Sequence, residues 1–195
     1  MICYTIGSTP LQSKEPGLAN KKISRVDAVE RFLSATTTLL CSKTPAELTL
    51  ADIADQADVS QHYIYRFFGT RLDLLIEVSD LLAFQTNEAL QREISSKELH
   101  FTQLVELCRS LCAQRIHLLQ YLAIQGVPES RFQDGNRKIY TCISQYFKNS
   151  GVQPARALSN GVVLLAFIHA EISLLPTLDL QSEELADLFT LLDAG

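Results

Sequence analysis

The apolar positions between Thr49 and Arg71 constrain the fold of this chain more than any other segment does. Small and aliphatic side chains recur there at the spacing of a helix, and the phase breaks at Val59 before a second stripe begins. The first stripe is Leu50, Ile53, Ala54 and Ala57, and the second is Ile64, Phe67 and Phe68. This pattern predicts two short helices that pack across a tight turn, which is a helix-turn-helix.

Polar residues stand where the ends of these two helices are expected. Thr49 is a candidate N-cap for the first helix and Ser60 for the second, because a hydroxyl can accept a hydrogen bond from an exposed backbone N–H. Asp58 falls where the turn needs a left-handed residue, a conformation that Asp tolerates, though less easily than Gly. The turn is therefore encoded locally.

The second helix presents an unusual set of outward side chains. Gln61, His62, Tyr63, Tyr65 and Arg66 offer amide, imidazole, phenol and guanidinium groups, which can meet base edges or phosphates in a DNA groove. An ordinary polar surface can carry the same residue types. The ordered turn beside them favours the DNA-binding interpretation.

The segment resembles the DNA-binding signature of the TetR family of bacterial transcriptional regulators. The matching positions are Leu50, Ile53, Ala54, Ala57, Val59, Ser60, Ile64, Tyr65, Phe68, Arg71, Leu74 and Leu75. Asp58 and His62 depart from the family, where both positions are often Gly. Because His62 changes the surface that would face DNA, the operator sequence cannot be inferred from a relative.

The resemblance implies a role for each residue of the candidate interface. Gln61, His62, Tyr63 and Arg66 would read bases or neighbouring phosphates, Tyr65 would contact the backbone, and Ser60 would belong to the same contact set. Thr49 and Arg71 would clamp phosphates on either side. Both stand at predicted helix starts, where exposed N–H groups and the helix dipole favour an anion.

We expect an all-α chain with a three-helix, helix-turn-helix DNA-binding head, joined by a long helix to a helical ligand-binding and dimerisation body. The expected domains are a loose N-terminal tail over 1–20, the head over 21–70 and the body over 71–195. Helices are predicted at 24–43, 71–94, 98–114, 116–125, 129–149, 154–175 and 182–193, besides the two of the motif. The long helix at 71–94 would span about 36 Å.

Charge is distributed unevenly along the chain. The total of −5 is unusual for a DNA-binding protein, but residues 1–71 hold eight Lys/Arg against seven Asp/Glu, which gives +1, whereas residues 72–195 hold nine against fifteen, which gives −6. Because phosphate affinity depends on local charge at the contact face, Lys21, Lys22, Arg25, Arg66 and Arg71 matter more than the total.

The five cysteines are odd in number and scattered, so a disulfide framework is not expected. The longest apolar run, residues 161–175, is interrupted by His169 and Glu171, and we therefore expect no membrane span and a cytoplasmic protein. Recognisable catalytic motifs are absent from the sequence, so neither enzyme activity nor a cofactor is expected. Cys108 and Cys112 lie four apart with His117 nearby, but this spacing does not match a structural zinc motif, and a thiol sensor role stays open.

The body is expected to bind a small, mainly apolar effector. Candidate lining residues are aromatic, sulfur-containing or isolated polar residues of its helices: Phe101, Leu104, Cys108, Cys112, His117, Tyr121, Tyr140, Phe147 and His169. Residues of these types are more often plain core than pocket lining, because mixed apolar and aromatic linings occur in both environments.

The predicted helix at 154–175 is apolar on more than one face, so it needs two sets of partners. By resemblance, one set is the matching helix of a second subunit, in a four-helix interface shared with 182–193; a buried central helix in a monomer is the alternative. A homodimer would place two recognition helices about 34 Å apart on a pseudo-palindromic operator.

These expectations describe a one-component transcriptional regulator, a repressor that an effector releases from double-stranded operator DNA. The competing hypothesis is a TetR-like ligand-binding or scaffold protein that has lost sequence-specific DNA binding. The acidic total charge, Asp58 and His62 motivate this alternative.

Overall fold

The computed structural model describes residues 23–96, 99–174, 184–185 and 189, and every regular element within them is a helix. The expected all-α fold class is confirmed. The chain divides into two compact units, Met1–Leu74 and Leu75–Gly195. The expected tail over 1–20 lies outside the described residues.

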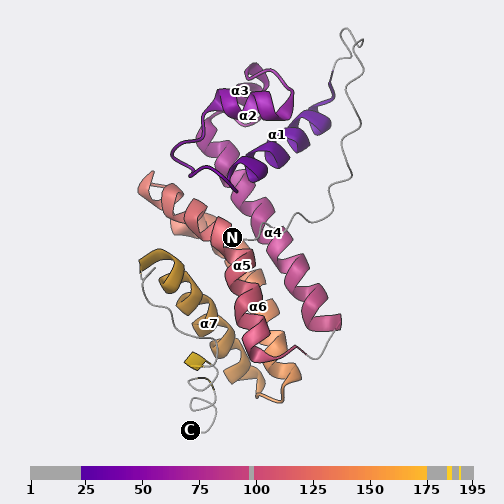
Figure 1. The fold of residues 1–195 in the computed structure, drawn as a ribbon, viewed down its shortest axis with the longest axis vertical. Helices are drawn as coiled ribbons and strands as arrows, with labels where there is room; N and C mark the ends of the chain where they lie inside the picture. Colours follow the sequence, from indigo (N-terminus) through magenta and orange to yellow (C-terminus); the bar gives the residue numbers. More distant parts are fainter. Residues whose placement is uncertain (1–22, 97–98, 175–183, 186–188, 190–195) are drawn as a thin grey trace. The chain divides into compact units, whose positions relative to one another are not determined.

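The first unit holds three helices, α1 (Arg25–Leu39), α2 (Leu50–Ala57) and α3 (His62–Phe67), which are labelled in Figure 1. The helix α1 packs against both α2 and α3. Phe32, Ile53 and Ile64 are fully buried in its core, and the rings of Phe32 and Phe68 meet edge to face at 6.2 Å. The aromatic and aliphatic core fixes the orientation of the short α3 helix.

The expected end of the first helix is wrong. It ends at Leu39 rather than Lys43, because the chain leaves the helix through turns over residues 40–42. Val26, the second residue of this helix, is 74% exposed although it is apolar. The buried stripe runs instead through Ala28, Phe32, Ala35 and Thr36, and Val26 lies off that face.

Short polar motifs cap the helices of the first unit. At the start of α2, the Thr49 hydroxyl accepts a hydrogen bond from the Asp52 N–H at 3.1 Å, while the Asp52 carboxylate accepts one from the Thr49 N–H at 3.1 Å. Thr70 and Asp73 form the same reciprocal pair before the next helix. Such boxes satisfy N–H groups that a helix start would leave without partners. The expected N-cap role of Thr49 is confirmed.

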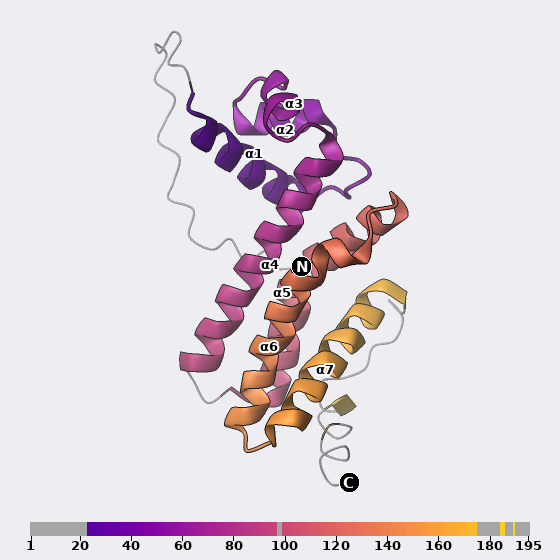
Figure 2. The ribbon, with the colours of Figure 1, turned by 180° about the vertical axis from the view of Figure 1, so that it is seen from behind.

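The second unit contains the long helices of the body, which Figure 2 shows from behind. Helix α4 (Arg71–Ser96) contains the unit boundary, and it is followed by α5 (Phe101–Ile124), the 3-10 turn η1 (Glu129–Phe132), α6 (Gln133–Asn149) and α7 (Pro154–Leu174). The helix α7 packs against α6 and α5. Leu185 and Phe189 belong to the buried core of this unit, and the rest of the predicted 182–193 helix, apart from Glu184, lies outside the described residues.

The two helices predicted at 98–114 and 116–125 are one continuous helix, α5. Nothing in the sequence around Gln114 and Arg115 breaks a helix, since both residue types have good helix propensity. The predicted break is therefore wrong. Arg115 therefore lies in the middle of α5 and not between two helices.

Helices α6 and α7 approach each other closely at Gly161. A Cβ atom at this position would lie 2.7 Å from the Tyr140 carbonyl oxygen and 3.1 Å from the Ser144 backbone nitrogen. Both atoms belong to the α6 backbone, which a side-chain rotation cannot move. Glycine is thus required for this helix crossing.

The helix α7 is more apolar than expected from the sequence. Its segment Pro154–Ser173 is long and apolar enough to cross a membrane by length and composition, with a mean hydropathy of 1.3. The segment is longer than the apolar run at 161–175 that the sequence analysis considered. One such helix is weak evidence for a span, and here Glu171 forms an ion pair with Arg109 of α5 at 3.0 Å.

Candidate nucleic-acid interface and effector-binding body

The turn between α2 and α3 has the geometry that the sequence predicts. Asp58 ends α2 in the left-handed conformation, with φ 53° and ψ 43°. The N–H groups of Asp58 and Val59 donate to the carbonyls of Asp55 and Ala54, which closes a Schellman motif. Val59 is buried beyond it. This turn fixes where α3 begins relative to α2.

The start of α3 differs from the expectation. Gln61 rather than Ser60 occupies the N-cap position, and no side-chain hydrogen bond caps the helix. The Tyr63 N–H instead donates to the backbone carbonyl of Ser60 at 3.0 Å. The first turn is tight, so a backbone carbonyl takes the role that was expected for the Ser60 hydroxyl.

The polar side chains of α3 are not equally exposed. His62, Tyr65 and Arg66 are exposed and Gln61 is half-buried, whereas Tyr63 is half-buried and stacks on Phe67 with ring centroids 5.3 Å apart. Ile64 is fully buried on the opposite face. The helix therefore presents amide, imidazole, phenol and guanidinium groups to solvent from a rigidly seated backbone.

Two arginine side chains lie against the ring of Phe67. The guanidinium carbons of Arg25 and Arg66 lie 5.7 and 5.9 Å from its centroid. These contacts hold two positive groups of α1 and α3 beside the same ring. The positive charge that a phosphate backbone requires is thereby concentrated next to α3.

Thr49 is occupied within its own unit. Its hydroxyl donates to an Asp52 carboxylate oxygen at 2.7 Å, and the Lys43 ammonium lies 2.9 Å from the other oxygen of that carboxylate. Hydrogen bonding from Lys43 and then from Thr49 lowers the pKa of Asp52 to about 2. The backbone start of α2, rather than the Thr49 hydroxyl, is the part that stays available to a phosphate.

Arg71 is likewise engaged inside the first unit, since its Nη2 donates to the carbonyl oxygen of Pro45. Arg71 is the first residue of α4, and Pro45 is buried in the loop that precedes α2. The contact ties the loop to the start of the long helix. Arg71 stands at the helix start that the sequence predicted, and its guanidinium has a structural partner there.

The nine residues predicted to line an effector site do not form one group. Leu104, Cys108, Cys112 and Phe147 lie in the buried core cluster, and Phe101 packs against it. Tyr121 and Tyr140 are half-buried, while His117 and His169 are exposed. The structure thus brings five of the nine together and places both histidines at the surface.

The three core cysteines are held as thiols. Burial raises the pKa of Cys108 well above its ordinary value, that of Cys112 to about 12 and that of Cys142 to about 11. Cys142, from α6, was not among the predicted residues. In the part of the chain that the structure describes, no group of three His, Cys, Asp or Glu side chains could hold a metal ion.

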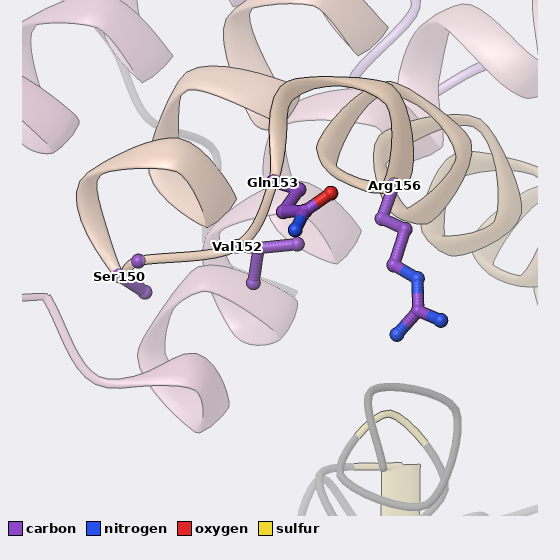
Figure 3. A pocket seen from close by; sticks show the side chains of 5 residues that line it. Ser150, Val152, Gln153 and Arg156 are labelled. Carbon is purple, nitrogen blue, oxygen red and sulfur yellow. The ribbon is translucent and has the colours of Figure 1, made fainter. Parts of the chain in front are cut away.

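A surface hollow of about 430 Å³ lies at the turn between α6 and α7 (Figure 3). It is lined by Ser150, Gly151, Val152, Gln153 and Arg156. None of the nine predicted effector residues belongs to this lining. Its polar, open character does not fit the mainly apolar effector that the sequence suggests.

Sequence reasoning missed a buried arginine in the body. Arg115 of α5 is only 4% exposed, and its Nη1 donates to the Asn136 Oδ1 at 2.6 Å. Nothing in the sequence distinguishes it from a surface arginine. The capping box formed by Thr70 and Asp73 was also not predicted, although a Thr followed three residues later by an acidic residue indicates a helix start.

Comparison with known proteins supports the helix-turn-helix assignment. Residues 32–78 match the family model described as "Bacterial regulatory proteins, tetR family". No curated protein sequence matches this chain.

Solved structures share the fold over most of the chain. A putative TetR-family transcriptional regulator from Mesorhizobium loti has 17% identity and a TM-score of 0.60, with 88% of this chain and 98% of that chain covered. A TetR-family regulator from Pectobacterium atrosepticum has 17% identity and a TM-score of 0.63, with 86% and 93% covered. Thermus thermophilus FadR, a repressor solved with lauroyl-CoA, has 19% identity and a TM-score of 0.53, with 84% and 92% covered.

Proposed function

We propose that this chain is a homodimeric transcriptional repressor of the tetR family of bacterial regulatory proteins, whose family model matches residues 32–78 and whose fold the chain shares. In this proposal the first unit binds a pseudo-palindromic operator in double-stranded DNA. A small effector, bound in the second unit, releases the protein from that operator.

The observation that carries the proposal is the surface of α3. His62, Tyr65 and Arg66 are exposed on a helix whose opposite side is fixed by the buried Ile64, and the half-buried Gln61 directly precedes this helix. Side chains of these types can hydrogen-bond base edges and phosphates. Tyr63 would contribute less to base reading, because it stacks on Phe67.

The exposed face of α7 supports the homodimer. Leu158, Val162 and Val163 are each more than 40% exposed, while Ala157, Leu164 and Ile168 of the same helix are buried within the unit. A helix with two apolar faces and one set of partners needs a second set. A second copy of the chain supplies it, and an operator with two half-sites needs two heads.

The effector part of the proposal uses the continuity of α4, which begins at Arg71 beside the head and continues to Ser96 in the body. An effector lowers operator affinity if it binds more tightly to a conformation whose two heads cannot reach successive major grooves. Each kcal/mol by which it prefers that conformation over the DNA-binding one lowers operator affinity about fivefold. A precedent for a ligand on this fold is FadR from Thermus thermophilus, a repressor that was solved in complex with lauroyl-CoA.

The proposal is tested by selecting fragments of the source genome that the full-length protein binds, and by titrating one bound fragment with variants. Arg66→Ala should weaken binding by at least tenfold and reduce the slope of log affinity against log salt by about 1, because one cationic contact is lost. Arg137→Ala is the control, since Arg137 is an exposed arginine of α6 in the second unit.

Failure of the wild-type protein to retain any genomic fragment would overturn the proposal. That result would instead support the ligand-binding or scaffold protein that has lost DNA recognition. Equal losses for Arg66→Ala and Arg137→Ala would show that binding is non-specific attraction to charge, which contradicts the role proposed for α3.

A further inference from the structure

A buried guanidinium in the second unit has more donors than partners. Arg115 is 4% exposed; its Nε donates to the Ser79 carbonyl oxygen at 3.2 Å and its Nη1 to the Asn136 Oδ1 at 2.6 Å. Its Nη2 is buried without a hydrogen-bond partner. Leaving such a group unsatisfied is costly, more so for a charged group than for a neutral one.

A second orphaned group lies next to it. Ser79 of α4 is fully buried, and its Oγ also lacks a hydrogen-bond partner. Because the backbone carbonyl of the same residue accepts from Arg115, the two orphaned groups belong to residues in direct contact. Together they offer three hydrogens, two on Nη2 and one on Oγ.

Arg115 has no direct ion-pair partner among the described residues. Asp80 is a carboxylate whose charge acts on Arg115 without such a pair. Burial lowers the pKa of Arg115 from its ordinary value. Asn136 lies in the first turn of α6, where the helix dipole adds positive potential.

We propose that Ser79, Arg115 and Asn136, the Arg115 cluster, bind the carboxylate of a small organic acid, and that this acid is the effector. A carboxylate has two oxygens with about four acceptor sites, which suits the three unused hydrogens. Its negative charge would also give the guanidinium the direct ion-pair partner that it lacks among the described residues. The identification of the ligand as an effector rests on the proposed regulatory function, whereas the binding itself does not.

The remainder of the ligand would be apolar. Cys112 precedes Arg115 by three residues on α5, and Ala83 follows Ser79 by four residues on α4, so each shares a helix face with its neighbour. Both belong to the buried core cluster of this unit. A carboxylate held at the Arg115 cluster therefore directs the rest of the molecule toward apolar side chains.

At Gly135, the backbone of α6 approaches Arg115 closely. A Cβ atom there would lie 2.9 Å from Arg115 Nη2 and 2.9 Å from Ala83 Cβ. The backbone of α6, rather than a side chain, thus covers the orphaned nitrogen. The proposal therefore requires the first turn of α6 to move away from Arg115 when the carboxylate binds.

The test uses the full-length protein without DNA and measures affinity by calorimetry. Octanoate and 4-phenylbutyrate are the carboxylate probes, and octan-1-ol and 4-phenylbutan-1-ol are their neutral counterparts. We expect at least one carboxylate to bind the wild type tenfold or more tightly than its alcohol. Arg115→Met should abolish this preference, and Ser79→Ala should reduce carboxylate affinity about tenfold through loss of one charge-assisted hydrogen bond.

Ser144→Ala is the matched control, because Ser144 is also a buried serine but its hydroxyl already donates to the Thr141 carbonyl at 2.7 Å. It should leave carboxylate affinity unchanged. Without probe, Ser79→Ala should unfold at a temperature no lower than that of the wild type, since its hydroxyl has no partner to lose. It should nevertheless show a smaller rise in melting temperature with octanoate or 4-phenylbutyrate.

Equal affinity for carboxylates and alcohols, or unchanged carboxylate affinity in Ser79→Ala, would overturn the inference. Neither result depends on DNA, so the outcome is separable from the proposed repressor function. Carboxylate binding that leaves operator affinity unchanged supports the Arg115 cluster as a site and contradicts its role as the effector site.

Discussion

At the scale of single residues, Asp58 adopts a backbone conformation that is unfavourable for its residue type. It is the only non-glycine residue with a positive φ in the described part of the chain. A left-handed conformation costs most L-residues about 1–2 kcal/mol, which Asp reduces by local hydrogen bonding. The recognition turn thus accepts a small cost in stability.

Asp58→Gly should therefore stabilise the first unit by about 0.5–1 kcal/mol, because glycine adopts this conformation without strain. Denaturant unfolding followed by circular dichroism measures the change. The same replacement at the exposed Asp55, within α2, is the control and should destabilise the protein through the low helix propensity of glycine. Stabilisation by both variants would contradict the argument from backbone conformation.

Asp52 supplies a second prediction at this scale. Its pKa of about 2 is lower than the ordinary 3.8, chiefly because of the hydrogen bond from Lys43. The depressed pKa means that this carboxylate stabilises the folded state fully above about pH 4, and that its contribution is lost as the pH falls through about 2. The window lies on the acid side because the folded-state pKa is the lower one.

A titration of the Asp52 carboxyl carbon by NMR measures this value directly. Lys43→Met should move the pKa of Asp52 back toward 3.8, because the largest cause of the shift is removed. Lys148→Met, at an exposed lysine of α6, should leave the pKa unchanged. An unchanged pKa of Asp52 in Lys43→Met would show that the hydrogen bonds from Thr49 alone cause the shift.

At the scale of elements, the crossing of α6 and α7 depends on the absence of a side chain at Gly161. Gly161→Ala should destabilise the second unit by about 1–2 kcal/mol: forcing a methyl against backbone costs about 1–3 kcal/mol, and the better helix propensity of alanine returns up to about 1 kcal/mol. Thermal or denaturant unfolding measures the change.

The control for the crossing is Ser159→Ala, an exposed position of the same helix. It should stay within about 0.5 kcal/mol of the wild type, as is usual for surface substitutions. A stabilised Gly161→Ala would mean that the two helices can separate without penalty, contrary to the distances at this crossing.

The comparison of sequence with structure is also clearest at this scale. The helix-turn-helix could be predicted because its signals are local: an N-cap at Thr49, a left-handed residue at Asp58 and an apolar stripe that changes phase at Val59. The false break inside α5 arose where no local signal existed. Ser60 was misplaced because a backbone carbonyl, which every residue has, replaced its hydroxyl.

The body could be predicted less well for a physical reason. Which face of a helix is buried depends on neighbours that are distant in sequence, so Arg115 and His117, two residues apart on α5, end in opposite environments. Composition places both at the surface by default. Only the packing of α4, α5 and α6 around Arg115 reveals the buried cation.

At the scale of the whole molecule, the apolar outer face of α7 determines the proposed assembly. Val162→Glu should convert the dimer to a monomer at micromolar concentration, because a carboxylate would be buried without a partner in the interface. Sedimentation velocity measures the mass. Operator affinity should fall with it, since a single head reads only one half-site.

Ile124→Glu is the matched control for this prediction. Ile124 is 80% exposed at the end of α5 and Val162 is 43% exposed, so both substitutions place a carboxylate at an exposed aliphatic position of the same unit. The control should remain dimeric and bind DNA like the wild type. Dissociation by both variants would indicate that added charge, and not the α7 face, controls assembly.

The rate at which the buried thiols of the body are alkylated would measure how often its core opens to solvent. Cys108, Cys112 and Cys142 are buried and held protonated, whereas Cys41 of the first unit is exposed. Alkylation requires a solvent-accessible thiolate, so the three can be labelled only when the core opens, at a rate that reports the local opening equilibrium. With Cys3 replaced by serine, the exposed Cys41 serves as the internal reference. If a compound slows the labelling of the other three cysteines relative to Cys41, it binds the folded body. This assay detects binding without any measurement of DNA affinity.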